Sequence, residues 1–187
     1  MKKSILGIFS FILVASACRS QQPISKIAAS EIKALGITYK VNKNESKFTV
    51  LKNERNKLSD VAQITPNLPN GLRATYYMEV DKKMLAKICA DAIPLNTLKQ
   101  LPMGMNDRID IYTKVDVNGI PIEMDFIVQN TSLITAVELS KIETKMKDGS
   151  FKINFNKEIK PYIKGANYFP ISLGISYFDI LTVKQGN

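Results

Sequence analysis

The sequence predicts an α+β fold in which an antiparallel sheet carries helices packed on one of its faces. Three observations predict this class. Alternating apolar residues flank Asn118-Gly119 between positions 108 and 128, which is the pattern of a β-hairpin. A helix with capping-box spacing begins at Thr135, and a further alternating strand follows over 169–177. A helix that connects antiparallel strands packs naturally on one face of their sheet.

The residues before position 53 predict one helix and two short strands. Helical spacing of apolar residues over 24–35 predicts an amphipathic helix that ends at Gly36. Its apolar positions are Ile24, Ile27, Ala28 and Leu35. Strands are expected over 37–41 and 47–52, and the turn-rich stretch 42–45 separates them.

The middle of the chain predicts a long loop followed by a strand and a helix. Residues 53–71 are rich in Asn, Pro and Gly and are expected to form a surface loop. Alternation over 72–80 predicts a half-buried strand. Asp81 is expected to cap the next helix, which Pro94 ends, and an apolar turn should follow over 95–103.

From position 108 onward the predicted order is strand, strand, helix, strand, strand. Asn118-Gly119 predicts a two-residue type I′ turn with positive φ at both residues. The predicted inward positions of the first two strands are Ile109, Ile111, Val115 and Val117, then Ile120, Ile122, Met124, Phe126 and Val128. Pro121 lacks an N–H group and should lie at an irregularity or face outward. The helix should stop at Gly149, and the last strands are expected over 151–155 and 169–177.

The first eighteen residues have the pattern of a secretory signal peptide. Two lysines precede an apolar run over 5–14, and the small residues 15–17 precede Cys18. A cysteine directly after such a site resembles the lipobox of bacterial lipoproteins, which implies that the Cys18 thiol carries lipid in the mature protein. Ala15 stands where the lipobox usually has Leu, so simple secretion after Ala17 is the alternative. A membrane-spanning helix is not expected, because such a helix needs about 20 apolar residues. The apolar run over 5–14, which Gly7 and Ser10 interrupt, is too short.

This resemblance implies a location and an organisation. Arg19 follows the cysteine in place of the aspartate that retains many lipoproteins at the inner membrane, so the outer membrane is expected, with the protein facing the periplasm or the surface. The mature chain of 170 residues is enough for one domain or two small ones. We expect residues 18–23 to be a tether, followed by parts over 24–107 and 108–187 that belong to one domain or two.

Composition excludes several kinds of chemistry. The sequence has no histidine, which rules out His-based triads, His-ligated zinc and histidine general bases. Without Lys2 and Lys3, 24 basic against 17 acidic residues leave a net charge of +7, and the lysines are dispersed, as on a solvated surface. Cys89 is expected to be a buried core thiol, so it offers no disulfide partner to Cys18.

The segment from Arg108 to Tyr177 resembles the C-terminal domain of TonB-type proteins. The resemblance rests on three stretches: IDIYTKVDVNGIPIEMDFIVQNTS, LITAVELSKIETKMK and GANYFPISLGISY. It implies a similar shape and a sheet edge that accepts a strand from a partner. The proline-rich spacer of the transducers is missing, and Phe151–Phe155 replaces their aromatic-proline element, so energy transduction is not expected.

These observations favour a lipid-anchored, non-catalytic binding or assembly module of the cell envelope. It would contact the membrane through its lipid and an envelope protein as partner, without nucleic acid, cofactor or metal. One alternative is a carboxylate-based hydrolase of envelope polymers. Its candidate residues are Asp107, Asp110 and Asp116, or Glu123 and Asp125, although the last three alternate with apolar residues as on a solvent face. Another alternative is a binder of anionic glycan or lipopolysaccharide that uses Lys141, Lys145 and Lys147.

Overall fold

Six strands form one antiparallel sheet in the spatial order β1-β2-β3-β6-β5-β8. The computed structural model describes residues 21–186 except 46, 65, 67, 69–72 and 105, so the predicted signal peptide and Cys18 lie outside the described residues. The strands are β1 (Glu31–Ala34), β2 (Ile37–Lys43), β3 (Phe48–Asn53), β5 (Arg108–Val115), β6 (Pro121–Gln129) and β8 (Phe169–Ser176). Strands from 24–107 and from 108–187 therefore share one sheet.

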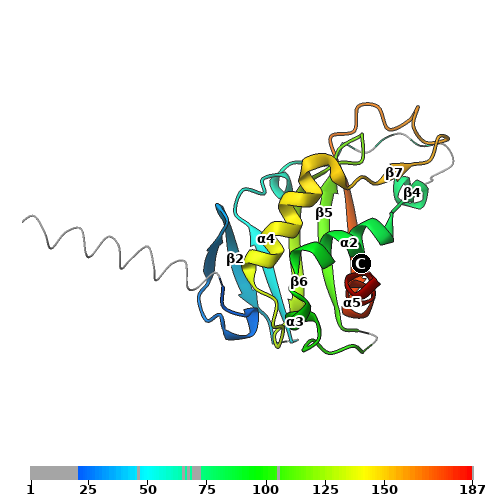
Figure 1. The fold of residues 1–187 in the computed structure, drawn as a ribbon. Helices are drawn as coiled ribbons and strands as arrows, with labels where there is room; N and C mark the ends of the chain where they lie inside the picture. Colours follow the sequence, from blue (N-terminus) through cyan, green and yellow to red (C-terminus); the bar gives the residue numbers. More distant parts are fainter. Residues whose placement is uncertain are drawn as a thin grey trace, which may run out of the picture.

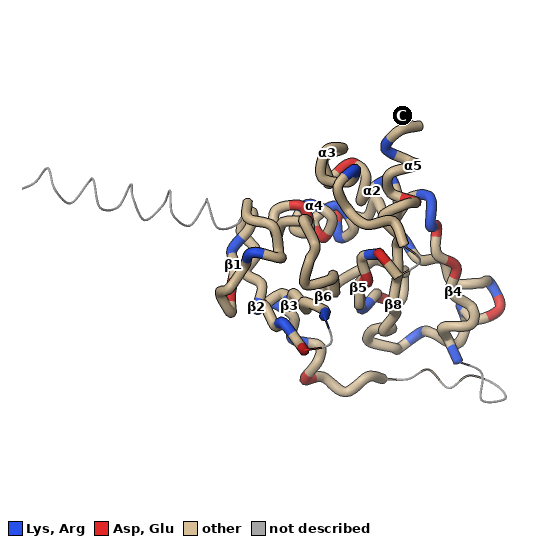
Figure 2. The backbone as a smooth tube through the Cα atoms, turned by 90° about the horizontal axis from the view of Figure 1, so that it is seen from below, with Lys and Arg blue, Asp and Glu red and all other residues tan. Residues whose placement is uncertain are grey.

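Helices cover one face of this sheet, which confirms the predicted α+β class (Figures 1 and 2). They are α2 (Lys82–Ala92), α3 (Leu95–Leu98), α4 (Ala136–Lys145) and α5 (Tyr177–Gly186). Helix α4 packs against β1, and α2 lies between α4 and α5. Within the described part of the chain, none of these helices combines the length and the apolar character needed to cross a bilayer.

The hydrophobic core lies between the helices and the inward side chains of the sheet. Along β5 the odd-numbered residues point inward, and along β6 the even-numbered residues from Met124 to Val128 do so. Cross-strand pairing places Phe126 between Ile111 and Leu51. All three side chains are fully buried. Such pairs of large apolar side chains are the main source of sheet stability.

The expected helix over 24–35 is wrong. A single 3₁₀ turn, η1 (Ile24–Lys26), precedes strand β1, which forms a hairpin with β2. Leu35 and Gly36 form the two-residue turn, with φ of 48° and 79°. Positive φ at both positions is the requirement of a type I′ turn. The alternation of Ile32 and Ala34 with exposed charged residues was the strand signal, and the helical spacing of the apolar residues concealed it.

The hairpin of β5 and β6 is confirmed, but its turn differs from the expected one. Only Gly119 has positive φ, and its N–H donates to the Asp116 carbonyl in a three-residue loop. Pairing slips between Lys114 and Val115, so Pro121 lies at an irregularity, as predicted. The bulge turns Ile122 outward, and Val117 in the loop is also exposed, so both predicted inward positions are wrong.

The two helix caps are confirmed. The Asp81 carboxylate accepts the Met84 N–H at the start of α2. At the start of α4, Thr135 and Glu138 form the reciprocal capping box. Gly149, with φ of 89°, closes a π-type turn η5 (Met146–Ser150) after α4.

Other elements depart from the prediction. The expected strand over 72–80 contains the 3₁₀ turn η4 (Ala74–Tyr77) and two strand residues, β4 (Met78–Glu79). Strand β4 pairs with β7 (Asn154–Phe155) in a separate small sheet, so 151–155 does not join the main sheet. Helix α5 was not predicted, although Ser176 caps it by accepting the Asp179 N–H.

One long connection crosses the open face of the sheet. Residues 54–64, here called the crossing segment, include the 3₁₀ turn η2 (Leu58–Asp60) and lead from β3 towards β8. Asn56 donates to the Met124 carbonyl of β6 at 2.9 Å. Further along, the Tyr168 hydroxyl donates to the Val61 carbonyl at 2.8 Å. The crossing segment therefore covers one end of a face that has no helix.

Candidate binding surface on the open face of the sheet

The structure separates the first group of predicted carboxylates. Asp107 accepts the Gln129 amide at 2.5 Å, and Asp110 pairs with Arg108 at 2.8 Å. Asp116 accepts backbone N–H groups within the β5–β6 turn. Asp110 and Asp116 lie six residues apart along an extended chain, which corresponds to about 20 Å. These three side chains therefore do not form one site.

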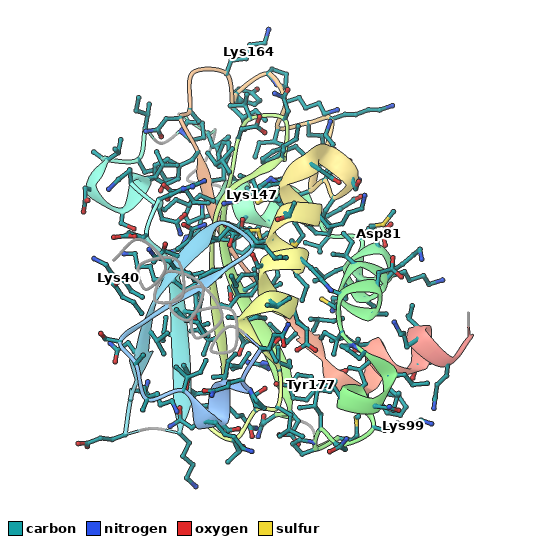
Figure 3. The ribbon with its side chains drawn as sticks, turned by 60° about the vertical axis from the view of Figure 1, so that its left-hand side comes forward. Lys40, Asp81, Lys99, Lys147, Lys164 and Tyr177 are labelled. Carbon is teal, nitrogen blue, oxygen red and sulfur yellow. The ribbon has the colours of Figure 1, made fainter. Side chains whose placement is uncertain are left out.

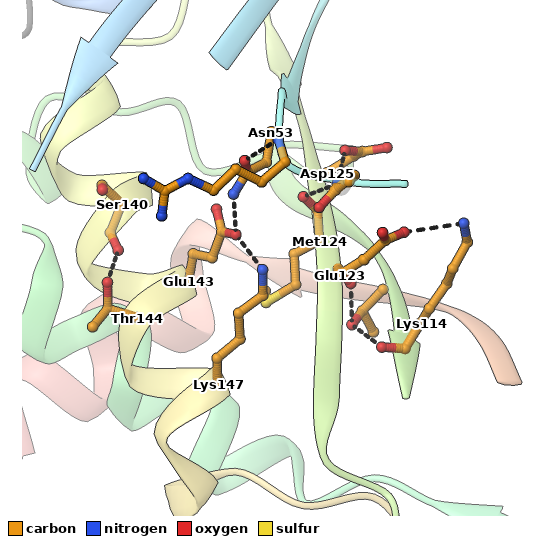
Figure 4. A network of polar contacts seen from close by, with 12 residues as sticks. Asn53, Lys114, Glu123, Met124, Asp125, Ser140, Glu143, Thr144 and Lys147 are labelled. Carbon is orange, nitrogen blue, oxygen red and sulfur yellow. Dashed lines mark hydrogen bonds and ion pairs between the residues drawn. The ribbon is translucent and has the colours of Figure 1, made fainter. Parts of the chain in front are cut away.

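Glu123 and Asp125 do come together, under the crossing segment (Figure 4). Glu123 is only 9% exposed, so the expected position on a solvent face is wrong. Its Oε1 accepts the backbone N–H groups of Lys57 and Leu58, the latter at 2.8 Å. Its Oε2 lies 3.2 Å from the ammonium nitrogen of Lys114.

The two carboxylates have pKa values displaced in opposite directions. Burial alone would raise the pKa of Glu123, but the N–H groups of Leu58 and Lys57 and the Lys114 ammonium lower it below its ordinary value of 4.5. Burial raises the pKa of Asp125 above its ordinary value of 3.8, although Asn56 donates to it at 2.7 Å. Such divergence can mark an acid–base pair. Here both oxygens of Glu123 are occupied by donors, and its evident role is to hold the crossing segment on the sheet.

A second buried carboxylate ties α4 to the sheet on the other face. Glu143 is 1% exposed and accepts the Tyr39 hydroxyl at 2.7 Å and the Asn53 amide at 2.6 Å. Lys147 supplies the positive charge at 2.5 Å. Burial, reinforced by Glu143, raises the pKa of Tyr39 well above its ordinary value. The network joins β2, β3 and α4, and its chemistry is that of a structural contact.

The three lysines predicted to bind an anionic polymer do not form a free basic face. Lys147 pairs with Glu143, and Lys145 pairs with Asp148 at 3.0 Å. Lys141 is exposed on α4. Two of the three charges are therefore compensated within the protein.

A hollow of about 290 Å³ opens on the sheet face that carries no helix. Strands β5, β6 and β8 form its floor, and the crossing segment forms one wall. Among its lining residues are Asn56, Ser59, Tyr112, Lys114, Asp125, Pro170 and Ser172. The Lys114 ammonium also lies 5.0 Å from the centre of the Tyr168 ring, a favourable cation–π contact that limits its movement.

Apolar side chains extend from this hollow across the open face. Val50 and Ile127 are cross-strand partners and are half-buried, although they point away from the core. Tyr112 is 52% exposed and Phe48 is 37% exposed on the same face. Polar side chains lie among and beside them. Asp110 is the cross-strand partner of Ile127, and Asp125 lies between Tyr112 and Lys52. Lys40, beside Lys52, and Arg108 lie further out on the same face. We call this area, together with the hollow, the open-face surface.

The sequence pattern does not indicate this surface. Alternation along each strand indicates which side chains share a face, but it does not indicate which strands are neighbours. The register of β3 with β6 brings Val50 beside Ile127, although the two residues are 77 positions apart in the chain. No local signal carries that information.

The two cysteines of the sequence differ in what the structure says about them. Cys89 is fully buried in α2, which confirms the expected core thiol, and burial raises its pKa to about 12. Cys18 lies outside the described residues, and its lipidation stays a prediction. Among the described residues, no group of three His, Cys, Asp or Glu side chains is arranged to hold a metal ion.

The fold is similar to that of a DUF5043 family protein from Bacteroides uniformis ATCC 8492, known from a crystal structure. The TM-score is 0.59 at 19% sequence identity, over 83% of this chain and 88% of that chain. The likeness is one of fold alone. No protein-family model matches the sequence, and no curated protein matches it. The resemblances to lipoproteins and to TonB-type domains stay predictions.

Proposed function

We propose that this protein is a lipid-anchored, non-catalytic binding module of the bacterial cell envelope, and that it contacts a protein partner through the open-face surface. The proposal places Cys18 in the outer membrane through its lipid. It rests on one observation above all. Four apolar side chains lie on the sheet face that no helix covers, of which Tyr112 and Phe48 are exposed and Val50 and Ile127 are half-buried.

The composition of the open-face surface fits a protein partner. Protein interfaces typically have an apolar, aromatic centre surrounded by a polar rim. Here Tyr112, Phe48 and the pair Val50–Ile127 provide the centre. The hollow beside Tyr112 has room for a single side chain of a partner, and such anchored side chains carry much of the binding energy at interfaces.

The predicted tether supports a partner close to the membrane. Residues 18–23 number six, and an extended chain spans at most about 3.6 Å per residue, so the tether reaches about 20 Å. A domain held within that distance of the lipid meets other envelope proteins at high local concentration.

The carboxylates on the open face support binding more than hydrolysis. A glycosidase needs one carboxyl group free to donate a proton and a second free to attack or to activate water. Glu123 accepts hydrogen bonds on both oxygens and pairs with Lys114. Asp125 alone does not supply the two free carboxyl groups that a glycosidase needs.

Site-specific photocrosslinking tests the proposal. A photoreactive phenylalanine analogue replaces Tyr112 in the full-length protein, in the cells that produce it. A matched control replaces Tyr162, which is 45% exposed and lies in the turn before β8. We expect one defined protein adduct from position 112 and none of the same mass from position 162.

Two further outcomes decide the matter. An adduct at Phe48, on the same face, should contain the same partner as the adduct at Tyr112. Equal adducts from positions 112 and 162, or no adduct from 112 and 48 in folded protein, would overturn the proposal. Circular dichroism of the purified variants shows whether they are folded.

A further inference from the structure

A second hollow, of about 330 Å³, lies between the β5–β6 turn and the segment over 152–164. Three lysines line it, and two asparagines lie between them. The polar lining residues are Lys152, Lys160, Lys164, Asn118 and Asn154. This hollow is separate from the open-face surface and shares no lining residue with the first hollow.

Among the described residues, no ion pair compensates the positive charge of this hollow. No carboxylate is among its lining residues. None of the three lysines takes part in an ion pair within the part of the chain that the structure describes. Asp116, in the adjacent turn, accepts the backbone N–H groups of Asn118 and Ile120 on Oδ1 and the side-chain amide of Asn118 on Oδ2. All three lysines are exposed, and three like charges carried by one concave surface favour the binding of an anion.

The backbone that carries these side chains is held in place. The Ile153 N–H donates to the Gly119 carbonyl at 2.9 Å, which joins the β5–β6 turn to the strand beside Lys152. A Cβ atom at position 119 would lie 1.8 Å from the Ile153 carbonyl oxygen, so only glycine allows this approach. The buried side chains of Ile159 and Ile163 fasten the turns that carry Lys160 and Lys164.

The walls of the hollow also contain apolar surface. Phe155 and Ile163 are almost fully buried, yet both contribute to its lining. Small-molecule sites commonly combine apolar walls with a few polar groups, in volumes of about 300–1,000 Å³. The hollow is thus suited to a compact ligand with one strongly anionic end.

We propose that this second hollow, here called the lysine hollow, binds the phosphate group of a small organic phosphate. The phosphate would belong either to a sugar phosphate or to the headgroup of a phospholipid. Lysine ammonium groups bind phosphate as point charges with several donors each. Asn154 offers its side-chain amide to the hydroxyls of the attached sugar or glycerol. Asn118 offers its amide oxygen, because its amide nitrogen donates to Asp116. This inference is independent of the protein partner proposed for the open face.

Calorimetric titration of the purified full-length protein tests the inference, with glucose 1-phosphate and glycerophosphoglycerol as the two probes. The test variant combines K152Q, K160Q and K164Q. The matched control combines K33Q, K99Q and K141Q, which remove the same number of charges at exposed positions outside both hollows. Figure 3 places Lys99 at the opposite end of the molecule from Lys164. We expect saturable binding of at least one probe, weakened at least about tenfold in the test variant and unchanged in the control.

The two probes distinguish the sources of the phosphate. Binding of glucose 1-phosphate alone identifies a sugar phosphate, and binding of glycerophosphoglycerol alone identifies a lipid headgroup. Affinity should fall as the salt concentration rises, and glucose without phosphate should not bind. Absence of binding by both probes, or equal affinities in the test variant and the control, would overturn the inference.

Discussion

At the scale of single residues, the most informative side chains are two buried carboxylates, Glu123 and Glu143. Each is satisfied by donors from segments far away in the sequence. Glu123 accepts from positions 57 and 58, and Glu143 accepts from Tyr39 and Asn53. A buried charge is tolerated only when such partners surround it. Each of these carboxylates therefore joins elements of the fold through its hydrogen bonds.

Replacing Glu123 by Gln should destabilise the protein by about 1–3 kcal/mol at neutral pH. The amide can accept one N–H group, but it offers no charge to Lys114 and places an NH₂ group near a donor. Because the folded-state pKa of Glu123 lies below 4.5, its carboxylate contributes stability above that pH and loses it as the pH falls through the folded pKa. In urea unfolding, the difference in the free energy of unfolding between wild type and E123Q should become smaller below pH 4.5.

Asp125→Asn is the matched control for that pH dependence. The folded-state pKa of Asp125 is raised, so its ionised form costs stability at neutral pH and the cost disappears on acidification. Wild type should therefore gain stability relative to D125N as the pH falls towards 4. If the two variants changed in the same direction relative to wild type, the assigned environments would be wrong.

At the scale of elements, local sequence signals predicted the positions of helices α2 and α4 and of the β5–β6 hairpin. Asp81 and Thr135 place the starts of α2 and α4 because a side-chain cap acts within three residues. The turn at Leu35-Gly36 was missed because a leucine with positive φ is uncommon, and its strain is compensated by the pairing of β1 with β2. Helix α5 carries a cap at Ser176, but its first residue, Tyr177, continues the alternation of β8 and concealed the change of structure.

Gly119→Ala should destabilise the protein by at least about 2 kcal/mol more than Gly165→Ala. Both glycines have positive φ, so both variants incur backbone strain of about 1–2 kcal/mol. Only at position 119 does the new Cβ meet a backbone atom, whereas nothing lies within 4 Å at position 165. Urea unfolding at one pH measures both. Equal losses of unfolding free energy in the two variants would show that the close approach of Gly119 to the Ile153 backbone does not restrict position 119.

At the scale of the whole molecule, one sheet unites both parts of the chain. The blue N-terminal strands form one side of the sheet, and the orange loop that carries the lysine hollow lies at the far end (Figure 1). The helices occupy one face and leave the other to the crossing segment and the open-face surface. This arrangement leaves the two proposed binding regions on separate parts of the surface.

Cys18→Ser should release the protein from the membrane fraction. The proposed anchor depends on the thiol, which forms the thioether to the lipid, and serine cannot replace it. Fractionation of cells that produce the full-length protein measures the distribution, and mass spectrometry of the mature N-terminus measures the attached lipid. An unmodified N-terminus in wild type, or an unchanged membrane fraction for C18S, would contradict the lipid anchor.

The sequence by itself determined the fold class, the capped helices, the hairpin around Gly119 and the core position of Cys89. All of these depend on interactions within a few residues or on the period of apolar side chains. The tertiary structure alone decided the neighbours of each strand, the burial of Glu123 under the crossing segment, and the gathering of Lys152, Lys160 and Lys164. Those features depend on contacts between segments far apart in the chain, and hydrophobic periodicity contains no information about which segments meet.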